Sequence, residues 1–307
     1  MLRPRPIPAL VGICLAWGTI PAVVAPVDLP PQVITASRVW LASLALAAVV
    51  VLRPSLLGPA PVIVGGSRLR TGLLALGAGG MLAAHWTLQF AAYQRAPAPT
   101  VSFVIFLAPV GVAALAPLVL AEPTPVRTVG ALAVAVLGAA LVTGPSARGS
   151  TALGLVLAAG SAAGLVGLTL FAKPLAQVLG GPRSALAQLS VAAVILSPVV
   201  IGVLAGAQGR PRLAWSRLAV LGLVHTALFV SVYLWALARL PVATVGVIGQ
   251  LEPVGVTVVA AVQGAVPAAT TLLGGALIVG AGALVATSLT ARRPVPPPLL
   301  EVPHDPR

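Results

Sequence analysis

Ten long apolar runs dominate this sequence, and short segments that hold most of the charges separate them. At about 20 residues, each run is long enough to cross the roughly 30 Å hydrocarbon core of a bilayer as an α-helix. The runs are 7–26, 33–52, 72–94, 99–120, 126–143, 151–172, 184–206, 217–237, 242–263 and 269–290. Only 7% of the residues are charged, against about one quarter in soluble proteins. The sequence therefore predicts an all-α integral membrane protein with ten transmembrane helices.

The formal net charge of +13 would point to nucleic acid in a soluble chain. Here the bases lie mostly between apolar runs, where they set topology and meet anionic headgroups, so we expect a lipid bilayer and no nucleic acid as the partner. With both termini cytoplasmic, the inside segments hold twelve basic residues and the outside loops five, although Arg210, Arg212 and Arg217 cluster outside. The Ala-, Gly-, Pro- and Arg-rich composition is typical of a GC-rich bacterial genome, which predicts the bacterial plasma membrane.

An internal repeat divides the chain into two halves. At an offset of 144 residues, "FLAPVGV" at 106–112 meets "QLEPVGV" at 250–256, and at an offset of 142 "GICLAWGT" at 12–19 meets "GLVLAAGS" at 154–161. Five spans per half is an odd number, so the second half enters the membrane with the opposite orientation. We expect two inverted five-helix repeats, residues 1–145 and 146–291, and a Pro-rich, disordered cytoplasmic tail, 292–307.

Glu252 lies inside the ninth span, where the first half has Ala108. A charged side chain at mid-membrane costs about 2.5 kcal/mol or more unless it is neutralised, paired or in contact with water. Glu252 is therefore a candidate for proton coupling or for binding a substrate amine. The alternative is a protonated structural glutamate that bonds a neighbouring helix. Pro109 and Pro253, at matching positions of the repeat, are candidate hinges or plain bends, because each proline removes a backbone hydrogen bond.

Polar and aromatic side chains gather in the third and eighth spans. His85 and Gln89 are four residues apart and share a helix face, with Trp86 beside them. Inside a membrane such a stripe faces protein or water, which favours a substrate-binding wall, although the aromatic residues also suit an interfacial belt. His225 is the counterpart in the second half, offset by four residues from the repeat position of His85. Each histidine also fits a structural role, bonded to a backbone carbonyl.

Arg38 lies about one and a half turns into the second span. There it either reaches back to the outer interface or binds an anion. Cys14 is the only cysteine, so an intrachain disulfide is excluded, and the three histidines lack the spacing of a metal site. We expect no metal and no cofactor. No phosphate-binding loop or nucleophile elbow occurs, which argues against ATP hydrolysis by this chain.

The chain resembles the EamA-type transporters of the drug/metabolite transporter superfamily. The resemblance is carried by "AWGT" at 16–19, by Arg38, by the Arg-x-Pro turns before spans four and nine, and by "LAPV" and "LEPV". It implies a ten-span exporter or permease with a central cavity lined by the first four spans of each half. It also places Trp17 and Thr19 near that cavity, whereas small-residue packing is the other explanation for this stretch. In the family a Gly-Glu pair closes spans four and nine. Here Ala121-Glu122 keeps the first acid, and "QGAVP" at 263–267 lacks the second.

These observations predict a secondary transporter that exports a small metabolite, amino acid or drug by alternating access, with Glu252 as the coupling group. The candidate cavity residues are Trp17, Thr19, His85, Trp86, Gln89, His225, Gln250 and Glu252. A non-transporting membrane scaffold or regulatory subunit is the alternative, and it would have a sealed interior with its polar residues paired. An intramembrane enzyme is disfavoured, because one glutamate and two histidines inside the membrane do not make a nucleophile and base pair. The sequence leaves the substrate and the oligomeric state open.

Overall fold

The computed structural model describes residues 5–57, 67–144, 149–205 and 213–290, and the described chain is helical throughout. The expected tail, 292–307, lies outside these residues. The helices of the first repeat are α1 (Pro6–Trp17), α2 (Ile20–Val24), α3 (Pro31–Leu52), the short η1 (Pro54–Leu57), α4 (Ser67–Tyr93), α5 (Ala98–Ile105), α6 (Ala108–Val119) and α7 (Val126–Thr143). Those of the second are α8 (Ala152–Leu179), α9 (Gly181–Ala205), α10 (Leu213–Val220), η2 (Leu221–Leu228), α11 (Phe229–Leu237), α12 (Val242–Gly249), α13 (Glu252–Val262) and α14 (Ala269–Thr290).

Within the described residues, eight helical segments are long and apolar enough to cross a membrane. The predicted spans 72–94 and 184–206 are not among them, although they correspond to α4 and α9, which are 27 and 25 residues long. In α4, polar side chains such as His85 and Gln89 interrupt the apolar stretch. The structure is therefore a multi-pass helical bundle of the predicted class.

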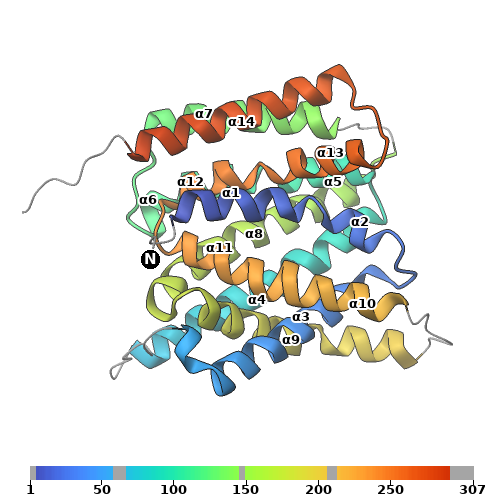
Figure 1. Cartoon of the computed structure of the whole chain (residues 1–307), viewed down its shortest axis with the longest axis vertical. Helices are drawn as coiled ribbons and strands as arrows, with labels where there is room; N and C mark the ends of the chain where they lie inside the picture. Colours follow the sequence, from blue (N-terminus) through green and yellow to red (C-terminus); the bar gives the residue numbers. More distant parts are fainter. Residues whose placement is uncertain (1–4, 58–66, 145–148, 206–212, 291–307) are drawn as a thin grey trace, which may run out of the picture.

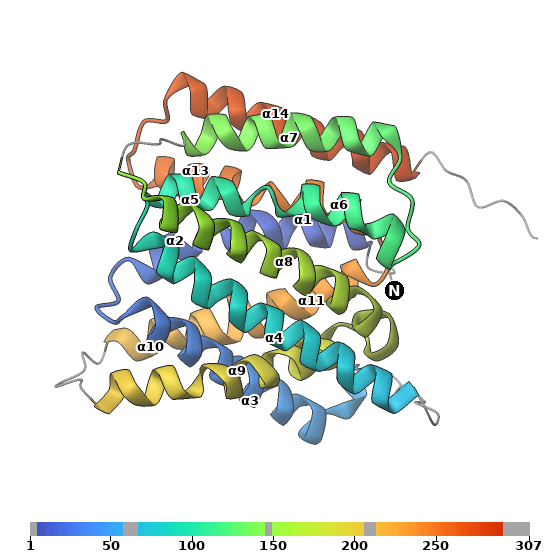
Figure 2. The ribbon, with the colours of Figure 1, turned by 180° about the vertical axis from the view of Figure 1, so that it is seen from behind.

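The helices form an elongated bundle in which α7 and α14 pack together at one edge (Figures 1 and 2). At the other edge lie α3 and α9, which also pack against each other. Between these edges α1, α5, α6, α8, α12 and α13 fill the middle of the bundle. The helix α1 starts, and the helix α14 ends, at the same end of the bundle (Figure 1). An even number of membrane crossings between the two ends of the chain would give this arrangement.

Three of the predicted spans are broken into two helices. The breaks fall between α1 and α2, between α5 and α6 and between α12 and α13, and a proline occupies the first turn after each break. Proline suits this position because the first helical turn leaves its N–H groups unpaired in any case. The last two breaks are repeat equivalents, since Phe106 (φ −65°, ψ −6°) and Gln250 (φ −66°, ψ −4°) are 144 residues apart and share one conformation.

Glycines bring the broken spans into close contact. A Cβ atom added to Gly18 would lie 2.2 Å from the carbonyl carbon of Gly255, and one added to Gly255 would lie 2.2 Å from the carbonyl oxygen of Leu15. Because real Cβ atoms do not approach backbone atoms so closely, the contact between α1 and α13 requires glycine on both sides. This contact places the C-terminal end of α1 beside the first turn of α13, where Glu252 lies.

Candidate functional site

The centre of the bundle contains a cavity of about 570 Å³. Its wall is formed by residues from α1–α6 of the first repeat and from α8, α9, η2 and α11–α13 of the second. Among the described residues, none from α7 or α14 contributes. This is the distribution that the resemblance implied, with the fifth span of each half at the edge. The volume falls in the range of small-molecule sites in proteins, about 300–1,000 Å³.

Most of the residues predicted from the sequence lie on the cavity wall. These are Trp17, His85, Trp86, Gln89, Pro109, His225, Gln250 and Glu252. Two do not line it. Thr19 lies behind the wall, where its hydroxyl is 2.7 Å from Nε2 of His225, and Pro253 is buried in the first turn of α13.

A hydrogen bond joins the two repeats at their matching helix breaks. The side-chain amide of Gln250 donates to the main-chain carbonyl of Phe106 at 2.7 Å, and these two positions are 144 residues apart. A carbonyl freed at a helix break is costly inside a membrane unless a neighbour satisfies it. Gln250 does so across the repeat interface, while its own Oε1 atom has no partner among the described residues. The interface between the two breaks is therefore held by side-chain chemistry as well as by packing.

Each of the two cavity histidines contacts a hydroxyl group from the other repeat. Nε2 of His225 lies 2.7 Å from the Thr19 hydroxyl, and Nδ1 of His85 lies 2.8 Å from the hydroxyl of Ser161. Thr19 and Ser161 are equivalent at the 142-residue offset, so the two pairs join equivalent spans of the two repeats, although His225 lies four residues from the repeat position of His85. The structural role that the sequence left open for both histidines was a bond to a backbone carbonyl, and Nδ1 of His85 lies 3.0 Å from the carbonyl oxygen of Ser161 and Nδ1 of His225 lies 3.4 Å from that of Val220. Their rings hold the first span of each repeat against the third span of the other.

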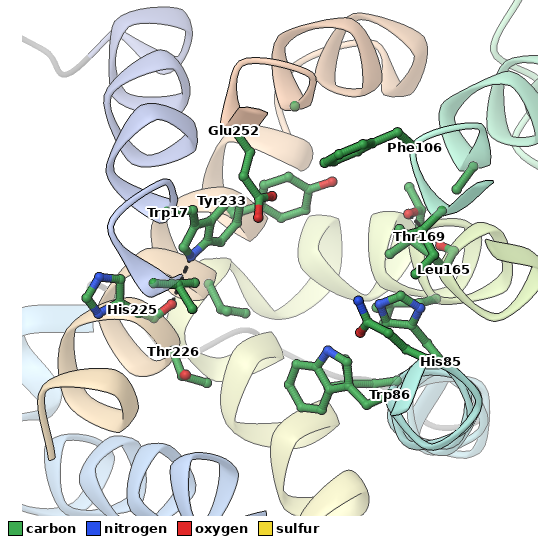
Figure 3. Close-up of a pocket in the computed structure, with 18 of the residues that line it drawn as sticks. Trp17, His85, Trp86, Phe106, Leu165, Thr169, His225, Thr226, Tyr233 and Glu252 are labelled. Atoms are coloured by element: carbon green, nitrogen blue, oxygen red, sulfur yellow. Dashed lines mark hydrogen bonds between the residues drawn. The ribbon is translucent and has the colours of Figure 1, made fainter. Parts of the chain in front are cut away.

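Glu252 extends from the first turn of α13 into the cavity (Figure 3). Its side chain is partly buried, and among the described residues no group donates a hydrogen bond to its carboxylate or forms an ion pair with it. Trp17 and Tyr233 also line this part of the wall, with their ring centroids 5.6 Å apart. The alternative that Glu252 bonds a neighbouring helix is not observed here. Its carboxylate faces the cavity instead.

Arg38 also faces the cavity, and the candidate residues predicted from the sequence did not include it. Its guanidinium carbon lies 4.2 Å from the ring centroid of Trp86, which is a cation–π contact. The side chain therefore turns inward and does not reach back to the outer interface. Further wall residues that the sequence analysis missed include Phe106, Gln188 and Tyr233. The sequence did indicate a special role for Gln188 and Arg38, because each is a polar residue within an apolar run.

A second polar cluster closes the bundle near one end of the cavity. Glu122, which follows α6, forms an ion pair with Lys173 at 2.9 Å. Its other carboxylate oxygen accepts a hydrogen bond from the main-chain N–H of Val242, the first residue of α12, at 2.9 Å. Lys173 also donates to the carbonyl of Leu240. Val242 itself lines the cavity, so this cluster, called here the Glu122 clasp, ties α6, α8 and the turn between α11 and α12 together beside the cavity.

A model of the EamA-like transporter family matches residues 5–144 and, a second time, residues 152–287. The two matches together cover most of the chain. The protein belongs to the EamA-like transporter family. It is thus a membrane transporter of the drug/metabolite transporter superfamily, built from two EamA repeats. Members of this family are transporters and not enzymes.

The fold of this EamA-like protein also occurs in solved structures. One of them, described only as a crystal structure of protein, is 20% identical and superposes with a TM-score of 0.76. The match covers 94% of this chain and 99% of the other. At this identity the likeness concerns the fold alone. No curated protein sequence matches the chain.

Proposed function

We propose that this EamA-like protein is a secondary transporter that exports a small metabolite, amino acid or drug across the bacterial plasma membrane by alternating access. The observation that carries the proposal is a central cavity that is walled by both repeats and contains a carboxylate, Glu252, for which the described part of the chain provides no ion-pair or hydrogen-bond partner. Intramembrane carboxylates that face a cavity are typical of substrate and proton pathways. Glu252 is accordingly the proposed coupling group.

The proposed motion is an exchange between two inverted five-span repeats around the central cavity. Ten spans follow if α4 and α9 cross the membrane together with the eight apolar segments. Three features support an inverted relation: the matching breaks before Pro109 and Pro253, the bond between Gln250 and Phe106, and the two histidine–hydroxyl pairs. In this arrangement the breaks are the hinges, because a helix without a continuous hydrogen-bond ladder bends at low cost.

The Glu122 clasp supports a gate at one end of the cavity. With cytoplasmic termini, as the positive-inside rule favours, the clasp lies at the cytoplasmic end, since α6 and α8 end where α1 begins. Opening the cavity to the cytoplasm would then require the ion pair between Glu122 and Lys173 to separate. The position in the second repeat that matches Glu122 is Val266, so the opposite end has no equivalent acid. Export as the direction of transport rests on the family resemblance.

Reconstitution tests the proposal. Proteoliposomes would be loaded on solid-supported membranes and exposed to amino acids, nucleosides and cationic drugs, and a pH-sensitive dye inside the vesicles would report electroneutral proton movement. We expect saturable, substrate-driven proton movement with the unchanged protein and none with Glu252→Gln, whereas Asp28→Asn, which removes an exposed acid, behaves as the unchanged protein. Proton movement that persists in Glu252→Gln would refute the coupling role. A folded protein that moves none of these compounds would contradict the transport function.

The scaffold alternative makes a different structural demand. A scaffold has no use for an interior space, and its polar groups should be paired with one another. Within the described residues, the cavity, together with the Glu252 carboxylate and the Arg38 Nε atom, neither of which has a hydrogen-bond partner there, does not meet that demand. These features favour a transporter over a scaffold.

A further inference from the structure

The two ends of the central cavity differ in how exposed their walls are. At the end opposite the Glu122 clasp, called here the far end, the wall includes residues of α2 and of the C-terminal part of α4 (Figure 1). Val24 and Tyr93, which line the cavity there, are partly exposed. At the clasp end the lining residues Leu234 and Val245 are each only 1% exposed. Access to the described wall is therefore greater from the far end.

The two repeats also pack differently at these two ends. The helices α6 and α13 are equivalent at the 144-residue offset, and so are α5 and α12. Within the described chain, α12 packs against α6 at the clasp end, whereas the equivalent pair, α5 and α13, is much less closely packed. Two pairs of half-helices that the repeat relates are thus together at one end and separated at the other. This difference is expected of an inverted repeat that occupies one of its two states.

The Glu122 carboxylate accounts for the close pair. Glu122 follows α6 and accepts the main-chain N–H of Val242, the first residue of α12, at 2.9 Å, so one side chain fastens the end of α6 to the start of α12. The repeat equivalents of these two residues are Val266, which follows α13, and Ala98, the first residue of α5. A valine side chain accepts no hydrogen bond. The end of α13 therefore cannot be fastened to the start of α5 in the same way.

The turn before α5 is attached to a different helix. Both the main-chain N–H and the hydroxyl of Thr151 donate to the carbonyl of Arg95 in this turn, at 3.0 and 3.2 Å. Thr151 is the N-cap residue of α8, so these bonds hold the turn to α8 and not to α13. The clasp consequently has no counterpart of the same chemistry at Val266.

A contact that exists in only one of two states favours that state. Lys173, whose side chain is 4% exposed, pairs with Glu122 at 2.9 Å, and separating a buried ion pair leaves an uncompensated charge. Closing the far end brings no equivalent pair together, because Val266 is apolar. Building on the proposed transport function, we infer that the Glu122 clasp sets the resting state of this protein, with the cavity open at the far end and closed at the clasp end.

This inference makes Glu122 and Lys173 positioning residues for transport, although neither lines the cavity. With the topology proposed above, the resting state faces outwards. An exporter in this state loads its substrate only after the clasp has opened, so the clasp controls the loading step.

Cysteine labelling in membrane vesicles tests the resting state. Cys14→Ala removes the only cysteine, and single cysteines then replace Ser102, on the part of the wall formed by α5, or Val245, at the clasp end. A membrane-impermeant maleimide is applied to right-side-out and to inside-out vesicles. We expect rapid labelling of Ser102→Cys from the far side and slow labelling of Val245→Cys from the clasp side. Equally rapid labelling of the two positions from these two sides would overturn the inference.

Variants of Glu122 test whether the clasp is the cause. Glu122→Ala removes both the ion pair and the bond to Val242, and it should raise the labelling rate of Val245→Cys from the clasp side about tenfold or more, as for a hydrogen bond to a charged group that only one state contains. Glu122→Gln keeps an acceptor for the Val242 N–H and should give a smaller rise. Thr124→Val is the matched control, because the Thr124 hydroxyl bonds the carbonyl of Ala113 within the same repeat, and it should leave the rate unchanged.

The outcomes separate gating from folding and from transport. An unchanged clasp-side rate in Glu122→Ala would overturn the role of the clasp, and so would an equal acceleration from both sides, which general loosening of the fold produces. Labelling requires no substrate. If the two ends respond as expected but the folded protein moves no compound, the resting state stands and the transport function fails. If a compound is moved while Glu122→Ala leaves labelling unchanged, the transport function stands and this inference fails.

Discussion

Loss of the carboxylate at Glu122 is expected to destabilise the protein more than loss of its partner Lys173. The side chain of Lys173 is only 4% exposed, whereas that of Glu122 is 26% exposed. Glu122→Gln therefore leaves an ammonium group buried with a single carbonyl acceptor, that of Leu240. Removing one member of a buried ion pair costs about 3–5 kcal/mol. Because Glu122 is partly exposed, the cost of removing its charge is lower than this range, and we expect a loss of about 2–3 kcal/mol in the free energy of unfolding.

Lys173→Met has a smaller expected cost, about 1 kcal/mol. It removes the buried charge, and Glu122 remains able to reach water and to accept the bond from Val242, at the N-terminus of α12 where a negative charge is favourable. The double variant removes both charges and should be about 1–2 kcal/mol more stable than the sum of the two single effects predicts. Reversible unfolding by SDS in mixed micelles measures all three. Equal single effects, or strict additivity, would refute this description of the clasp.

Three further changes test local features of the fold by thermal unfolding in detergent. Ala121 has a left-handed backbone (φ +53°), so Ala121→Gly should stabilise the protein by about 0.5–1 kcal/mol, and a lower melting temperature would contradict this. Gly255→Ala forces a Cβ against the carbonyl of Leu15 and should cost at least about 2–3 kcal/mol, whereas Gly12→Ala, which meets nothing within 4 Å, should have little effect. Ser161→Ala removes the hydroxyl beside a cavity histidine and should cost about 1 kcal/mol; no change would mean that this bond contributes nothing.

The order of the helices along the chain could be predicted from hydropathy, because backbone groups inside a bilayer must form their hydrogen bonds within helices. The 144-residue repeat likewise located the paired breaks, since prolines mark them. The break between α1 and α2 and the π-helical turn η2 were not predicted. The π-helical turn depends on tertiary contacts, whereas Pro21 marks the break before α2. In η2, for example, the main-chain carbonyl of His225 accepts a hydrogen bond from Trp17, which is 208 residues away in the sequence.

Arg38 shows why the site itself was only partly predictable. Its depth in the second span could be read from the sequence, but the direction of a long side chain depends on the rotation of the helix and on its neighbours. In the structure Trp86 of α4 provides a surface on which the guanidinium packs, and this turns the charge inward. Glu252 was easier to identify. A short acid deep in a span cannot reach the interface whichever way its helix is rotated.

The two histidine–hydroxyl pairs bear on the proposed exchange between repeats. They join equivalent spans of the two repeats, yet they differ: His85 and Ser161 are both buried in regular helices, while His225 lies in the π-helical turn and Thr19 next to a helix break. Alternating access requires matching contacts in the two repeats that have different surroundings in any one state. The opposite state then exchanges the surroundings of the two contacts. In the opposite state we therefore expect the distortion to move from the eighth span to the third, around His85. Trapping that state with a ligand and measuring hydrogen exchange in α4 and η2 would show whether protection shifts between them.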